Sequence, residues 1–89
     1  MDKLRFHNNR NIISAKVKEA RKRLELHQEH VAAKMQVLGV NILQRGISEI
    51  ENNKRLVTDY ELYCLSKVLK VNIEWFFSDF SLDDIQNTE

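Results

Sequence analysis

Apolar residues in the first third of the chain recur in steps of three and four, the spacing that aligns side chains along one face of a helix. This stripe consists of Ile13, Val17, Ala20 and Leu24. Asn11 stands just before the stripe and is a residue type favoured as an amino-terminal cap. The pattern predicts a first helix over about residues 12–24.

Two further helices follow. A second helix is expected to open at His27 or Gln28 and to end at Gly39, because glycine accepts the positive φ of a helix end. Asn41 is expected to cap a third helix, which stops at Asn52 and Asn53 because asparagine tolerates the left-handed conformation. The inward-facing residues of these two helices are predicted to be Val31, Ala32, Met35, Ile42, Ile47 and Ile50.

The fourth helix has the sharpest local signal in the chain. Thr58 and Glu61 have the spacing of a capping box, in which each side chain bonds to the backbone of the other, and the helix is expected to run to about Lys70. A fifth helix is predicted after Asn72 and carries Trp75, Phe76 and Phe77. Five short helices with tight connections indicate a compact all-α fold.

Composition agrees with one small helical domain. The chain has 89 residues, no proline and two glycines, which disfavours the turns of an all-β fold. One cysteine excludes an internal disulfide framework. No apolar run is long enough for a membrane span or a signal peptide, so we expect a cytoplasmic protein. We expect a flexible segment over 1–11, a folded domain over 12–78 and an acidic tail over 79–89.

Charge is distributed unevenly along the chain, although the formal net charge is only +1. Residues 1–34 carry a net charge of +5, residues 35–58 of +1, and residues 59–89 of −5. This polarity permits a basic face for an anionic partner on one half of the molecule, although an accidental asymmetry of a solvated surface would look the same.

Side chains that could support catalysis or metal binding are few. The three histidines and Cys64 lack the spacing of a zinc site, and no glycine-rich phosphate loop is present. Cys64 falls within the apolar stripe of the fourth helix, where a buried role is usual. The sequence therefore predicts a protein that is not an enzyme and needs neither a metal nor another cofactor.

Three segments in order carry a resemblance to a known family. They are VKEARKRLELHQEHVAAKM, ILQRGISEIENNKR and VTDYELYCLSKVLKVNIEWF. Together they resemble the Cro/repressor-type (XRE-like) helix-turn-helix regulators, whose fold is lambda-repressor-like. The resemblance covers Val17 to Phe76. The chain departs from the family pattern at Glu25, where glycine is usual, at His27 and Asn53, and in a longer link between the second and third helices.

The resemblance implies a transcriptional regulator, in particular a repressor, that reads the major groove of duplex DNA with its third helix. The expected base-reading residues are Gln44, Arg45, Ser48 and Glu49. The expected contacts to the DNA backbone are Gln28, Lys54 and Arg55. Arg21 and Glu51 are expected to form a salt bridge that ties the first helix to the third. The alternative for the polar residues is an ordinary solvated surface.

The resemblance also implies a homodimer, because a single small module covers only a short half-site. We expect the dimer surface in the carboxyl-terminal third, where large apolar residues crowd too closely to share one core. These residues are Trp75, Phe76, Phe77, Phe80 and Leu82. The alternative is that they close the core of the monomer. A second candidate function is a protein-interaction module, such as an antitoxin or a partner-binding subunit, and control by a regulatory partner protein is left open.

Overall fold

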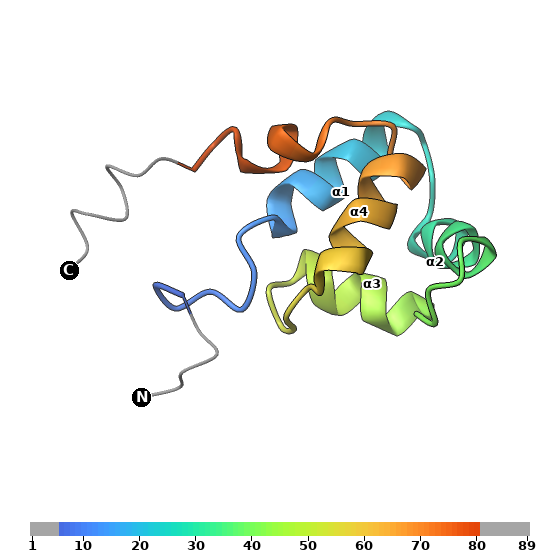
Figure 1. Cartoon of the computed structure of the whole chain (residues 1–89), viewed down its shortest axis with the longest axis horizontal. Coiled ribbons are helices and arrows are strands. Elements are labelled where there is room, and N and C mark those ends of the chain that lie inside the picture. Colours follow the sequence, from blue (N-terminus) through green and yellow to red (C-terminus); the bar gives the residue numbers. More distant parts are fainter. Residues whose placement is uncertain (1–5, 81–89) are drawn as a thin grey trace.

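The computed structural model describes residues 6–80, which form four α-helices and a short 3₁₀ helix (Figure 1). The elements are α1 (Ser14–Arg23), α2 (Gln28–Val37), α3 (Gln44–Glu51), α4 (Asp59–Val68) and η1 (Ile73–Phe77). Over the described range the only β-type pairing is an isolated bridge between Phe6 and Asn9. The all-helical class is confirmed, but the predicted fifth helix is a five-residue 3₁₀ helix, a form that proteins use in short pieces.

One hydrophobic core joins all five elements. α2 packs against α3 and α4, α1 packs against α3, and η1 lies beside α1 and α4 (Figure 1). The predicted apolar stripes meet in this core, so the periodic pattern located the inner faces correctly. The buried apolar residues are Ile13, Val17, Ala20, Val31, Ala32, Met35, Val40, Ile42, Ile47, Ile50, Leu65, Val68, Leu69 and Phe76.

The capping predictions had mixed outcomes. The Thr58–Glu61 capping box is confirmed, with Thr58 Oγ1 accepting from Glu61 N at 3.3 Å and Glu61 accepting from Thr58 N at 3.0 Å. The caps proposed for the first and third helices were wrong: α1 begins at Ser14 after Ile13, and α3 begins at Gln44 after Leu43. Asn11 Oδ1 instead accepts from the hydroxyl of Ser14, the first residue of α1, at 2.7 Å.

All four α-helices end in the same way. The residue after each carboxyl-terminal cap has a positive φ, and its N–H and the next N–H bond back to carbonyl groups of the last helical turn. These residues and their φ values are Glu25 (56°), Gly39 (92°), Asn53 (59°) and Lys70 (58°). Gly39 and Asn53 were expected in this role. Glu25, by contrast, takes a backbone conformation that costs a residue with a Cβ roughly 1–2 kcal/mol.

We therefore expect Glu25→Gly to stabilise the protein relative to Glu25→Ala. Both variants remove the carboxylate, but only glycine relieves the strain of roughly 1–2 kcal/mol. Because glycine also loses more conformational entropy on folding, the free energies of unfolding should differ by about 0.5–1 kcal/mol. Urea unfolding followed by circular dichroism measures the difference. Equal stability of the two variants would show that this turn carries no backbone strain.

The described part of the amino-terminal segment is held against the end of α3. Asn53 Oδ1 accepts from Arg10 N at 2.8 Å and from Asn11 N at 3.1 Å. Asn11 Nδ2 donates to the carbonyl oxygens of Ile50, at 3.2 Å, and Arg55, at 3.0 Å. Residues 6–11, part of the segment expected to be flexible, are thus fixed by several hydrogen bonds.

The carboxyl-terminal aromatic residues pack inward. Phe76 is 1% exposed, and Trp75, Phe77 and Phe80 are half-buried. Lys16 Nζ lies 4.5 Å from the centroid of the Trp75 ring and helps to cover it. Trp75, Phe76 and Phe77 thus belong to the monomer's core or pack against it, whereas the Phe80 ring lies 5.9 Å from that of Phe6, and none of these four residues is fully exposed as the proposed dimer surface would require. Leu82 and most of the acidic tail lie outside the described residues.

Candidate nucleic-acid interface

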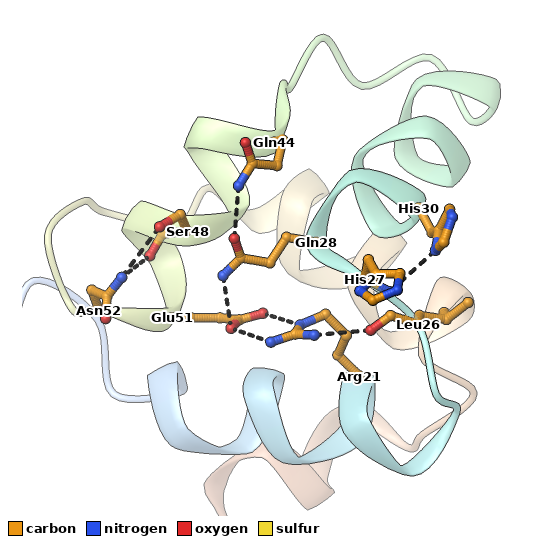
Figure 2. Close-up of polar contacts among 9 residues, drawn as sticks. All are labelled: Arg21, Leu26, His27, Gln28, His30, Gln44, Ser48, Glu51 and Asn52. Carbon is orange, nitrogen blue, oxygen red and sulfur yellow. Dashed lines mark hydrogen bonds and ion pairs between the residues drawn. The ribbon is translucent and has the colours of Figure 1, made fainter.

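The first residues of α2 and α3 lie side by side. Gln28 opens α2 and Gln44 opens α3, and Gln44 Nε2 donates to Gln28 Oε1 at 2.8 Å (Figure 2). Gln44 is exposed, whereas Gln28 is half-buried beneath it. Two glutamines that begin different helices therefore present one joint polar surface.

Beneath Gln28 lies an ion pair between α1 and the end of α3. Arg21 binds the Glu51 carboxylate through two hydrogen bonds, Nε to Oε2 at 2.7 Å and Nη2 to Oε1 at 3.0 Å. The Arg21 and Glu51 side chains are 11% and 2% exposed. Hydrogen bonding to Glu51 raises the pKa of Arg21 above its ordinary value, so the arginine stays charged under all usual conditions.

These contacts form one continuous hydrogen-bond chain (Figure 2). Gln28 Nε2 donates to Glu51 Oε1 at 3.1 Å, and Arg21 Nη1 donates to the carbonyl oxygen of Leu26 at 2.8 Å. The Gln44–Arg21 chain, meaning Gln44, Gln28, Glu51 and Arg21, thus links the exposed start of α3 to the turn between α1 and α2. Sequence reasoning named all four residues but missed this connection.

The outer face of α3 carries the four residues expected to read bases. Ile47 and Ile50 are fully buried, and Gln44, Arg45, Ser48 and Glu49 lie on the rest of the helix surface, where Gln44 and Arg45 are exposed and Ser48 and Glu49 are half-buried. The Arg45 side chain is 89% exposed and its Nε lies 3.5 Å from Glu49 Oε2, an i,i+4 pair. Exposed pairs of this kind contribute only about 0.3–0.5 kcal/mol, so Arg45 can leave Glu49 for a stronger partner.

Ser48 lies one turn beyond Gln44. Asn52 Nδ2 donates to Ser48 Oγ at 3.2 Å and to the Ser48 carbonyl oxygen at 2.8 Å (Figure 2). The Ser48 hydroxyl acts only as an acceptor in this pair, so its own hydrogen remains available for donation.

Gly46 has a packing role. A Cβ at this position would lie 2.6 Å from Ile42 Cγ1. Ile42 is 4% exposed and enters the core from the loop before α3. Glycine lets α3 pack directly over Ile42, which fixes where the helix begins.

Lys54 and Arg55, the basic residues expected on DNA phosphates, differ in their surroundings. Lys54 is exposed after the end of α3. Arg55 Nη2 lies 3.0 Å from Glu61 Oε2, and the Glu61 side chain is 5% exposed. Glu61 is the acidic member of the capping box, so Arg55 neutralises a buried carboxylate at the start of α4. The box was visible in the sequence, but the burial of Glu61 was not.

The hollow at the amino ends of α2 and α3 is polar and open. It is lined by Arg21, His27, Gln28, Glu29 and Gln44. His30 Nδ1 accepts from His27 N at 3.1 Å, which satisfies a backbone donor at the start of α2. Between residues 6 and 80, no cluster of three or more His, Cys, Asp or Glu side chains could hold a metal ion. None of the helices in that range is long and apolar enough to cross a membrane.

Comparison with known protein families identifies the family that has this arrangement of helices. A helix-turn-helix family matches residues 17–76, from the middle of α1 to η1. No curated protein and no solved structure matches the chain significantly. The matched range contains the packed pair α2 and α3, the Arg21–Glu51 ion pair and most of the core. The chain therefore belongs to the Cro/repressor-type (XRE-like) helix-turn-helix family.

Proposed function

We propose that this protein is a sequence-specific, duplex-DNA-binding transcriptional regulator that acts as a repressor and reads the major groove with α3. The observation that carries the proposal is the outer face of α3, where four polar side chains that can donate or accept hydrogen bonds stand together on a helix fixed by buried contacts. A rigid helix with such a face suits the reading of base edges, and a domain seated on DNA blocks access to the sequence that it covers.

The two side chains at the start of α3 have the groups needed for purine recognition. Gln44 uses one amide hydrogen for Gln28, which leaves its second hydrogen and its oxygen for the N7 and N6 groups of adenine. Arg45 can donate two hydrogen bonds to the O6 and N7 of guanine. One turn on, Glu49 can accept from cytosine N4, and the Ser48 hydroxyl suits more than one base.

Contacts to the DNA backbone would position this face. Lys54 follows α3 directly and is exposed, so it is suited to a phosphate. Gln28 would hold Gln44 in place while the amino end of α2 approaches the backbone. Arg55 would have to release Glu61 to reach a phosphate, so we assign it to the stability of the turn before α4.

Lys54→Ala is expected to weaken binding to specific and random duplexes by the same factor. Loss of one phosphate contact should reduce the slope of log K against log salt concentration by about one unit. Fluorescence anisotropy at several salt concentrations measures the slope. Lys18→Ala, an exposed lysine on α1, serves as the matched control. An unchanged slope for Lys54→Ala would remove this residue from the interface.

Selection of bound sites from a random duplex library tests the function directly. We expect one enriched motif whose two half-sites are related by inverted symmetry and are separated by about 34–36 Å along the duplex. Retention of no particular sequence, together with tight capture of a protein partner, would favour the protein-interaction module instead.

We also infer a homodimer, which needs a surface other than the carboxyl-terminal aromatic residues that pack inward. The outer face of α4 presents Tyr60 and Tyr63, which are 59% and 55% exposed. Exposed Asp59 stands at the start of this face and exposed Lys67 near its end. Two antiparallel α4 helices related by a twofold axis would pair Asp59 of each copy with the partner's Lys67 and would bury the tyrosines between them.

Tyr63→Asp is therefore expected to convert the dimer to a monomer, because it places like charges at the centre of the pairing. Sedimentation at tens of micromolar protein measures the change, and Tyr63→Phe should remain dimeric. A wild-type protein that sediments as a monomer, alone and on an inverted-repeat site, would contradict the dimer.

A further inference from the structure

Leu43, the residue directly before α3, is held in solvent although it is large and apolar. Its exposed fraction is 67%, whereas that of the preceding Ile42 is 4%. Leu43 has φ −102° and ψ 171°, an extended conformation in which neighbouring side chains point to opposite sides. Ile42 therefore enters the core while Leu43 points outward.

The backbone around Leu43 is fixed on both sides. Gln36 Nε2 donates to the carbonyl oxygen of Ile42 at 2.8 Å. The carbonyl oxygen of Leu43 accepts from Gly46 N at 2.9 Å and from Ile47 N at 3.2 Å, which closes the first turn of α3. Leu43 cannot turn inward without loss of these bonds and of the Ile42 anchor.

We propose that Leu43 reads the C5-methyl group of a thymine, either in the base pair contacted by Gln44 or in the adjacent one. This inference rests on the proposed function, because it needs the start of α3 in the major groove. Consecutive Cα atoms are about 3.8 Å apart, close to the 3.4 Å rise of a base pair, so Leu43 faces the same base pair as Gln44 or the adjacent one.

The chemistry of the groove selects the ligand. Among the base edges of the major groove, the thymine methyl is the one apolar group, and the others are hydrogen-bond donors and acceptors. Leu43 cannot satisfy a donor or an acceptor, and it would strip water from a polar edge without replacing the bond. A thymine at this position lets both apolar groups leave water together.

Replacement of thymine by deoxyuridine, which lacks only the methyl group, provides the test. Each thymine in one half-site of the selected duplex is replaced in turn, and affinities are measured by fluorescence anisotropy for wild type, Leu43→Ala and Leu43→Met. For wild type, one replacement should weaken binding about fourfold, since a buried methyl contributes about 0.8 kcal/mol. Leu43→Ala should bind the thymine duplex and that deoxyuridine duplex with equal affinity. Leu43→Met should regain part of the preference for thymine.

The outcomes separate this inference from the function on which it rests. A deoxyuridine effect of equal size in wild type and Leu43→Ala would overturn the assignment of Leu43 while leaving DNA recognition intact. Insensitivity of wild type to every replacement would do the same. A wild-type protein without affinity for any duplex would overturn both proposals. Circular dichroism confirms folding of the variants, which alter a side chain that is mostly in solvent.

Discussion

Arg21→Ala is expected to lower the free energy of unfolding by about 3 kcal/mol, the lower end of the range for breaking one side of a buried ion pair. The variant leaves the Glu51 carboxylate in a site where its side chain is only 2% exposed, with Gln28 as its remaining hydrogen-bond donor. The Leu26 carbonyl oxygen also loses its bond to Arg21. For a domain of this size the expected fall in melting temperature is about 12–24 °C, which a thermal scan measures.

Two further variants show whether the effect belongs to the pair. Lys22→Ala removes an exposed neighbour on the same helix and should change stability by less than about 0.5 kcal/mol. Arg21→Met combined with Glu51→Leu removes both charges and should recover much of the lost stability, because no buried charge is left unpaired. An Arg21→Ala protein as stable as Lys22→Ala would contradict the structural role of the ion pair.

Arg45→Ala is expected to weaken binding to the selected site by about 1–3 kcal/mol, or roughly 5- to 150-fold, and to relax the preference at one base pair. Stability should hardly change, because the Arg45 side chain is 89% exposed and its ion pair with Glu49 is a surface pair. Binding to the full set of single-base variants of the site measures both the loss of affinity and the position where discrimination disappears.

Lys54→Ala is the matched comparison for Arg45, since it also removes one exposed positive charge, from the segment that follows α3. It should weaken all duplexes alike and leave the preference intact. If Arg45→Ala also weakened every sequence by one factor, Arg45 would be a phosphate contact, and base recognition would rest on the remaining residues of the α3 face.

Much of this fold could be predicted from the sequence, because its main signals are local. The apolar stripes fixed the inner faces of the helices, and the Thr58–Glu61 spacing located the start of α4. The start of α3 was misplaced because a cap at Asn41 satisfied the local rules. The chain instead buries Ile42 from an extended loop, a choice that depends on how the loop packs against the core.

The candidate site was less accessible to sequence reasoning. Gln28 and Gln44 are sixteen residues apart, and only the packing of α2 on α3 brings them together. Arg55 also pairs with Glu61, whose burial no local pattern indicated. The inward packing of Trp75 and Phe77 likewise depends on residues of α1 and the amino-terminal segment far away in sequence.

The Gln44–Arg21 chain has a direction that Glu51 imposes. An ionised carboxylate can only accept hydrogen bonds, so Gln28 must turn its NH₂ group toward Glu51 and its oxygen toward Gln44. Gln44 must then turn its own NH₂ group toward Gln28. Rotation of either amide by half a turn would place two hydrogen-bond donors or two acceptors against each other. The outward-facing donor and acceptor of Gln44 are therefore fixed within the protein itself. If Gln44 reads a base as proposed, its preference would depend partly on a buried acid that does not itself reach DNA, and Glu51→Gln would leave the orientation of the Gln44 amide undefined.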